Sequence, residues 1–379
     1  MKVSPLFLLL LLLHFLVACK NNTEPANPVV EPVVDTPPPP TFTEQQVAGN
    51  PVVLVVRTAT AKAYQQPDFG APVVGHYQKE DSLVFTNRVT QEVTTQLVEG
   101  LTYQEPWLRI ILPNQEMAWI YGAHVDFEAQ AQPALAELVL YPRVAALFGE
   151  ELAQQMGIYQ KEIPLTGSLP AFRTLYSRAQ IIKDSLEKQL TNIQLAHPNQ
   201  TPNFFWINGL LQGLLLHYIP EQNKYYLFRD LKQWLAISQQ TPAPEDDAFM
   251  EVLLASYPAD SIAYYYYGWQ LPLENQTWCS LLGAGIHEQV LEKLDSAWDS
   301  SSYFLPELQT IQQAVLDDIA TTKNYWMPLP AVQQELDSIL QKDYAFFSRG
   351  DWVALKTKRA FLVAPKEHEL VLNLFEGEE

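Results

Sequence analysis

One cysteine and one histidine lie close enough in this sequence to be candidates for a catalytic thiol and its general base. Cys279 is followed by His287, and a thiol beside an imidazole base is a common nucleophile. The residues around the thiol, Trp278 and Ser280-Leu281-Leu282, are largely apolar, which predicts a buried cysteine of ordinary reactivity. We therefore expect Cys279 to be structural and not catalytic.

Two pairs of adjacent acids are the next candidates for chemistry. Asp246-Asp247 and Asp317-Asp318 both fall in helical patterns, where neighbouring side chains point about 100° apart. A glycosidase needs two carboxyl groups that converge on one bond. We expect these acids to cap helices or to face solvent.

Histidines that could bind a metal are scattered along the chain. Metal sites need clustered ligands, and His287-Glu288 lacks the second histidine of a zinc-peptidase helix. We expect no metal, no cofactor and no enzymatic activity. Structural or surface roles are the better interpretation for His76, His124, His197, His217, His287 and His368.

The run Tyr264-Tyr265-Tyr266-Tyr267-Gly268-Trp269 is the most unusual local composition. Its rings could line a groove for sugar or peptide by stacking. The alternative is a helix–helix packing site whose tyrosine hydroxyl groups reach the surface, and we favour this alternative.

Composition bounds the class of protein. The 379 residues carry a formal charge of −19, and 47% of them are hydrophobic, which is enough for a folded core. A surface this negative repels phosphates, so we exclude nucleic acid as a partner. The two cysteines are Cys19 and Cys279.

The N-terminal segment has the features of a signal peptide. Lys2 precedes an unbroken apolar run from Leu6 to Leu13, which is too short for a spanning helix of roughly 20 residues. The motif Leu16-Val17-Ala18-Cys19 resembles the lipobox of bacterial lipoproteins. The resemblance implies cleavage before Cys19, diacylglycerol on its thiol and no intramolecular disulfide. An ordinary secretory signal is the alternative.

A proline-rich stretch follows Cys19. Residues 20–45 include Pro25, Pro28, Pro32 and the run Pro37 to Pro40, and proline keeps such a segment extended and solvated. We expect a signal peptide at 1–18 and a lipidated cysteine with a tether at 19–49, held stably at the membrane by its acyl chains. Lys20 replaces the aspartate of inner-membrane retention signals, which favours the outer membrane.

Residues 50–128 carry the pattern of a small β-domain. Several short strands at close spacing, separated by Pro, Gly, Asn and Asp, are typical of a sandwich or barrel. The expected strands cover residues 52–56, 73–77, 82–85, 107–111 and 118–121.

The order of motifs in this region resembles the bacterial SH3-like domain. An added stretch from Thr86 to Glu105 lengthens one hairpin. The resemblance implies an all-β SH3-like barrel that binds cell-wall peptide or protein segments. The matching positions are Val56-Arg57, Val73-Val74-Gly75, Lys79-Glu80-Asp81, Trp107-Leu108-Arg109-Ile110 and Trp119-Ile120-Tyr121 with Val125.

Four aromatic residues are the candidate ligand-binding groove of this barrel: Tyr64, Trp107, Trp119 and Tyr121. Aromatic side chains supply large and rigid contact area. The alternative, which we favour for any one of them, is that they fill the barrel. The sequence departs from the family pattern in loops that carry ligand specificity, as at Thr58-Ala59-Thr60, so the ligand stays open.

Residues 129–379 are predicted to form a mostly α-helical domain of about eight helices. Apolar stripes at helical spacing begin near Phe172, and further helices are expected from about Asn203 and over 225–237. Residues 352–363 and 368–375 alternate enough to predict a C-terminal β-hairpin. No fixed repeat and no family resemblance is found here.

These patterns lead to two functional expectations. The favoured one is a multidomain, non-enzymatic lipoprotein of the cell envelope, whose barrel binds peptidoglycan or an envelope protein and whose helical region binds a protein partner. The alternative is a cell-wall or polysaccharide hydrolase with the helical region as catalytic domain. Peptidases that accompany SH3-like domains carry Asp-Cys-Ser-Gly at the nucleophile, and Cys279 lacks that Asp and Gly.

Overall fold

The structure is a computed structural model. It describes residues 42–129, 131–198, 200, 202–258, 260–273, 278–298 and 303–374. The predicted signal peptide, Cys19 and most of the predicted tether lie outside the described residues. Residues from Phe42 onward form one compact unit. No helix among the described residues is both long and apolar enough to cross a membrane.

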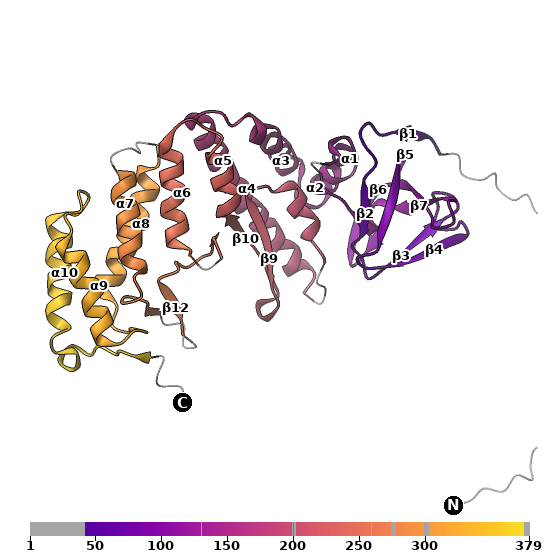
Figure 1. Ribbon diagram of the computed structural model, residues 1–379. Coiled ribbons are helices and arrows are strands. Elements are labelled where there is room, and N and C mark those ends of the chain that lie inside the picture. Colours follow the sequence, from indigo (N-terminus) through magenta and orange to yellow (C-terminus); the bar gives the residue numbers. More distant parts are fainter. Residues whose placement is uncertain are drawn as a thin grey trace, which may run out of the picture. The chain divides into compact units, whose positions relative to one another are not determined.

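The N-terminal part of this unit is a curled antiparallel sheet (Figure 1). The strand order is β4-β3-β7-β6-β5-β2-β8, and β1 pairs with β5. All five predicted strand runs are confirmed, and β1 falls within the stretch that the sequence assigned to the tether. The strands are β1 (Glu44–Gln46), β2 (Val53–Val56), β3 (Thr60–Tyr64), β4 (Val73–Gln78), β5 (Ser82–Val98), β6 (Leu101–Ile111), β7 (Met117–Tyr121) and β8 (Val125–Asp126).

The predicted long hairpin is the β5–β6 pair. Its ladder runs from Val84 opposite Ile111 to Val98 opposite Leu101. The turn is Glu99-Gly100, and both residues have positive φ (47° and 84°), as a two-residue hairpin turn that matches the twist of its strands requires.

The C-terminal part contains ten helices among the described residues. The longest, α4, buries Phe172, Leu175, Ala179, Ile182 and Leu186, which recur at helical spacing and confirm the predicted stripe. The helices are α1 (Pro133–Leu138), α2 (Leu140–Phe148), α3 (Glu150–Glu162), α4 (Leu169–Ala196), α5 (Leu231–Ser238), α6 (Pro244–Ser256), α7 (Ile286–Trp298), α8 (Leu305–Thr321), α9 (Leu329–Gln341) and α10 (Arg349–Phe361).

Two small sheets interrupt these helices and correct part of the prediction. The expected helices from Asn203 and over 225–237 are wrong in part. Residues 205–210 form a 3₁₀ turn, and the chain then enters a sheet of order β11-β10-β9 before α5 begins at Leu231. Its strands are β9 (Leu214–Ile219), β10 (Lys224–Asp230) and β11 (Ile262–Ala263), and a two-stranded sheet pairs β12 (Gln270–Pro272) with β13 (Trp278–Ser280).

The predicted C-terminal β-hairpin is also wrong, because residues 349–361 form α10. The Ser348 hydroxyl oxygen accepts a hydrogen bond from the backbone N–H of Asp351, and the Asp351 carboxylate accepts one from the backbone N–H of Ser348. This capping box satisfies two backbone donors that a helix start would otherwise leave free. Beyond α10, Asn324 forms an isolated bridge with Val371.

Candidate functional site: the junction pocket

A buried ion pair joins the first sheet to the helices. Arg143 of α2 donates from Nε and Nη2 to both carboxylate oxygens of Glu105 on β6, at 2.5 and 2.9 Å. Both side chains are at most 1% exposed. Arg143 also donates to the carbonyl of Gly122 at 3.0 Å and lies over the ring of Trp206 at 4.9 Å. A bidentate geometry with its remaining donors satisfied is what allows an ion pair to be buried.

The buried charges shift the pKa values of Arg143 and of the nearby Asp126. Burial would by itself lower the pKa of the Arg143 guanidinium, but the carboxylates of Glu105 and Asp126 raise it. Burial raises the pKa of the Asp126 carboxyl, and Arg143, 3.4 Å away, opposes that change. Gly122 is needed beside the pair, since a Cβ there would lie 2.7 Å from Glu105 Oε2.

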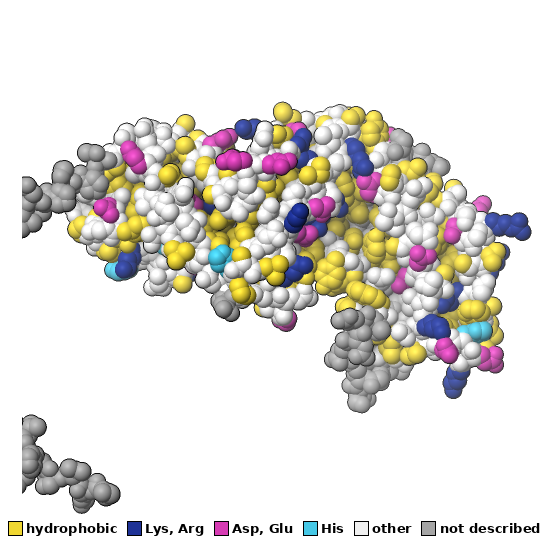
Figure 2. All heavy atoms as spheres, turned by 180° about the vertical axis from the view of Figure 1, so that it is seen from behind, with side chains coloured by type: hydrophobic (Ala, Val, Ile, Leu, Met, Phe, Trp, Pro, Cys, Tyr) yellow, Lys and Arg dark blue, Asp and Glu magenta, His cyan; other side chains and the backbone are white. Residues whose placement is uncertain are grey.

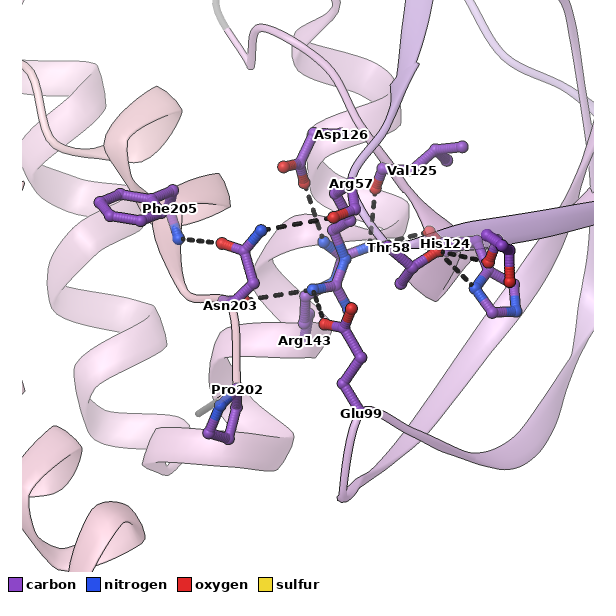
Figure 3. A network of polar contacts seen from close by, with 12 residues as sticks. Arg57, Thr58, Glu99, His124, Val125, Asp126, Arg143, Pro202, Asn203 and Phe205 are labelled. Atoms are coloured by element: carbon purple, nitrogen blue, oxygen red, sulfur yellow. Dashed lines mark hydrogen bonds and ion pairs between the residues drawn. The ribbon is translucent and has the colours of Figure 1, made fainter. Parts of the chain in front are cut away.

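A second arginine links the sheet to the chain after α4 (Figure 3). Arg57 Nη1 donates to the carbonyl of Asn203 at 3.1 Å, and the Asn203 side chain donates back to the carbonyl of Arg57 at 3.4 Å. Asn203 Oδ1 accepts from the backbone N–H of Phe205 at 3.0 Å. These bonds fix the start of the 3₁₀ turn against the end of β2.

A pocket of about 580 Å³ lies at this junction. One wall is β2 with the residues before it, and the opposite wall is the 3₁₀ turn after Asn203. Most of the lining is apolar, while Asp126 and Glu128 supply the carboxylates. We call it the junction pocket, and its principal lining residues are Val53, Val55, Asp126, Glu128, Phe205 and Trp206.

The pocket faces an open strand edge. Val52 O accepts from Phe85 at 3.2 Å and Val56 N donates to Asp81 at 2.9 Å, so even-numbered residues of β2 bond to the β5 side. Peptide groups alternate in direction along a strand, and those of Val53 therefore point the other way. Strand β8 pairs with Val55 and Val56 only, so no described strand continues beside Val53.

The two walls of the pocket also present exposed apolar side chains and one buried indole N–H that a ligand could contact. Val53 is 56% exposed and Phe205 45% exposed, although both are apolar. The indole N–H of Trp206 is buried and finds no acceptor among the described residues. The arrangement suits a ligand with an extended backbone and apolar side chains, because such a ligand pairs the strand edge and covers the exposed side chains of Val53 and Phe205.

The four aromatic residues predicted to form a groove lie elsewhere. Tyr64, Trp107, Trp119 and Tyr121 are between 0 and 8% exposed. Trp107 contacts both Tyr64 and Tyr121, with ring centroids 5.5 and 5.6 Å apart, and its indole donates to Thr94 at 2.8 Å. Their burial agrees with the alternative that they fill the interior of the sheet.

The thiol–imidazole pair is enclosed. Cys279 and His287 are both 0% exposed, and burial, followed by the charge of Asp318, raises the pKa of the thiol to about 11. His287 Nε2 lies 2.9 Å from Asp318, which also accepts from Ser280 at 2.5 Å. Through these contacts Asp318 ties β13, α7 and α8 together. No sulfur–imidazole hydrogen bond is seen among the described residues.

The paired acids have separate partners. Asp246 accepts from Thr241 at 2.7 Å and Asp247 from Ser238 at 2.5 Å, which fastens the start of α6 to the end of α5. Asp317 accepts from Gln313 on the same helix at 2.7 Å. Within the described ranges, no group of three or more His, Cys, Asp and Glu side chains is placed to hold a metal ion.

Sequence reasoning missed the residues that line the junction pocket. The sequence interpretation placed Phe204-Phe205-Trp206 in an expected helix. Three consecutive aromatic residues do not fit one apolar face of a helix, because neighbouring side chains point about 100° apart. Phe204 and Trp206 are buried whereas Phe205 is exposed. An aromatic run that follows Pro202-Asn203 was the available signal.

Comparison with known proteins yields no relative. Neither a protein-family model, nor a curated protein, nor a solved structure matches this chain.

Proposed function

We propose that this chain is a lipid-anchored protein of the cell envelope, without enzymatic activity, that binds an extended protein segment in the junction pocket. The observation that carries the proposal is the open edge of β2 beside an apolar pocket. A segment added there would extend the sheet, and its side chains would alternate between the pocket wall and solvent.

Charge favours a protein segment over cell-wall peptide as the ligand. Stem peptides of peptidoglycan carry carboxylates, and the junction pocket already holds those of Asp126 and Glu128. Like charges brought together disfavour binding. A segment with apolar side chains, flanked by Lys or Arg, would complement both the walls and the acids. Nucleic acid stays outside the proposal because the chain carries a formal charge of −19; on the face shown in Figure 2, Lys and Arg are scattered.

The proposal extends to domain identity. The curled sheet contains the motif order that resembles bacterial SH3-like domains, which supports a barrel domain at 50–128 and a helical domain at 129–379. The proposed binding face differs from the candidate aromatic groove, since that set of rings is buried.

The anchor is proposed from the lipobox alone. Lipidation at Cys19 would hold the protein at the envelope, with the outer membrane as the expected location. Labelling cells with an alkyne fatty acid tests it: label should enter the wild-type chain and not Cys19→Ala. Label in both chains, or in neither, would contradict the assignment.

Photo-crosslinking in intact cells tests the binding site. Phe205 is replaced by p-benzoyl-phenylalanine, because its exposed ring lines the pocket. The proposal predicts a discrete adduct with another protein, whose crosslinked peptide is identified by mass spectrometry.

The matched control places the same photoreactive residue at Leu195, which is 75% exposed near the end of α4. Leu195 should give no adduct of that mass. Identical adducts from both positions, or an adduct with peptidoglycan in place of protein, would refute binding of a protein segment in the pocket.

A further inference from the structure

Five aromatic side chains form a continuous, partly exposed surface on the two small sheets. Tyr226 comes from β10, Trp278 from β13, and the others follow β11. Ring centroids lie 6.0 Å apart between Tyr226 and Tyr265, 5.0 Å between Tyr265 and Tyr266, and 5.6 Å between Tyr266 and Trp278. We call this surface the aromatic platform: Tyr226, Tyr264, Tyr265, Tyr266 and Trp278.

The tyrosine run divides between the core and the platform. Tyr267 stacks on buried Trp269, with centroids 4.3 Å apart and planes at 4°. The backbone N–H of Gly268 donates to the end of α6 at 2.8 Å, which pins the loop. Tyr265 is 62% exposed and Trp278 is 41% exposed. The run is therefore a loop that presents rings to solvent, and the expected helix–helix packing site is wrong.

A buried phenylalanine supports the platform from below. Phe228 is 4% exposed and contacts Tyr264, with centroids 4.9 Å apart. It shares one face of β10 with Tyr226, because alternate residues of a strand point the same way, and their rings lie at 12°. Rings held in this way lose little further freedom when a ligand covers them.

A polar pocket of about 340 Å³ borders the platform at Tyr226, within the size range of small-molecule sites. Two carboxylates and two ammonium groups line it, so their charges cancel. Lys224 also lies over the Tyr226 ring at 4.5 Å. The polar groups come from Asp184, Glu187, Lys188, Asn192 and Lys224.

From this geometry we propose that the aromatic platform and its polar pocket bind a neutral oligosaccharide. A pyranose ring has an apolar C–H face, which stacks on aromatic rings, and an edge of hydroxyl groups, which need donors and acceptors. The platform supplies the rings. The pocket supplies both kinds of polar group, and Asp260, which accepts from the Tyr264 hydroxyl at 3.2 Å, adds an acceptor at the rim.

The balanced charge decides the class of ligand. An anionic polymer would meet a chain of charge −19, and a cationic one would compete with the two lysines already in the pocket. An uncharged glycan meets neither obstacle. The site is separate from the junction pocket, since the two share no lining residue, so either proposal can fail without the other.

Calorimetric titration of the full-length chain tests the proposal, in a detergent without a sugar headgroup. The probes are the hexamers of β-1,4-glucose, α-1,4-glucose, β-1,4-xylose and β-1,4-N-acetylglucosamine. At least one should bind with a Kd of about 1 mM or tighter. Trp278→Ala and Tyr265→Ala should each weaken that binding about tenfold or more, whereas Tyr265→Phe should retain most of it.

Tyr303→Ala is the matched control, because Tyr303 is 44% exposed and makes no part of the platform. It should bind as the wild type does. The proposal is overturned if no hexamer binds at 5 mM (roughly the weakest Kd of interest), or if the platform variants and Tyr303→Ala bind equally. It is also overturned if Trp278→Ala removes capture of a protein while no saccharide binds, which would make the platform a protein interface.

Discussion

Arg143 is the residue on which the contact between sheet and helices most depends. Its guanidinium is buried and meets Glu105, Gly122 and Trp206. Removing one member of a buried ion pair leaves the other charge without a partner. Arg143→Met should therefore lower the free energy of unfolding by about 3–5 kcal/mol, measured by urea denaturation.

Two further variants serve as controls for this prediction. Arg88→Met removes an arginine whose side chain is 45% exposed and which pairs with Glu44 at 3.5 Å, so it should cost at most about 0.5 kcal/mol. The double variant Arg143→Met with Glu105→Leu should regain much of the lost stability, because the fully buried carboxylate of Glu105 is removed together with its partner and only the part-exposed Asp126 loses an ion pair. Equal effects of the Arg88 and Arg143 substitutions would contradict a central role for the buried pair.

The burial of Lys358 on α10 should make the free energy of unfolding depend on pH. This lysine is 3% exposed, and burial lowers its pKa to about 8, against the opposing charge of Asp318 and with a smaller lowering from Lys323. Below pH 8 the folded state bears the whole cost of a buried ammonium. Between about pH 8 and the unfolded pKa near 10.4 the unfolded state binds more protons, so the free energy of unfolding rises with pH.

The measurement compares wild type with Lys358→Met by urea denaturation at pH 7 and pH 10. The wild type should gain about 2–3 kcal/mol relative to the variant over this interval. The comparison cancels groups that titrate in both chains. A constant difference between the two chains would show that Lys358 keeps an ordinary pKa.

Among the elements, the turn between β13 and α7 is held in a conformation that only glycine fits. Gly283 has φ of +103°, and a Cβ there would lie 2.8 Å from the backbone nitrogen of Val332 on α9. Its N–H also donates to the carboxylate of Glu335, which is 5% exposed. Positive φ is costly for any residue with a Cβ, and here the backbone of α9 blocks the added atom.

Gly283→Ala should lower the midpoint of thermal unfolding and cost about 2 kcal/mol or more. Gly167→Ala is the matched control, because a Cβ at Gly167 meets nothing within 4 Å. That substitution should be neutral or slightly stabilising. A tolerated Gly283→Ala would mean that the turn can move away from α9.

Element types followed from the sequence wherever one period was clear. The stripe of α4 and the β-branched strands of the first sheet were both correct. Residues 349–361 misled because Trp352, Val353 and Thr357 favour strands, yet the buried residues are Leu355 and Lys358, one helical turn apart. The capping box at Ser348 and Asp351 was visible in the sequence and outweighs that propensity.

The apolar residues around 210–215 misled for another reason. A short buried run fits helix and strand alike. Here Gly213, at φ of +81°, lies between the end of the 3₁₀ turn at Leu210 and the start of β9 at Leu214. The candidate site was beyond sequence reasoning, because it joins Val53 to Phe205 across residues far apart in the chain. Trp107 and Tyr121 were assigned to a binding groove only because they are aromatic, and the fold buries both of them.

At the scale of the whole molecule, the junction joins a curled β-sheet to a mostly helical region. Arg143 and Arg57 fix the helices against the sheet, and the pocket opens beside them where β2 has a free edge. A protein segment bound there would contact the sheet and the helical region at once. Its binding would therefore depend on the junction between them and not on the sheet alone.

The most direct test of the central claim combines the photo-crosslinker at Phe205 with Val53→Pro. Proline removes the N–H of Val53, which points away from β5, and leaves the bonds of β2 to β5 intact, since those come from the neighbouring residues. We expect the yield of the Phe205 adduct to fall about tenfold or more, the equivalent of one lost backbone hydrogen bond. The midpoint of thermal unfolding should stay within a few degrees of the parent chain. An unchanged adduct yield in a fully folded Val53→Pro chain would contradict binding at the edge of β2.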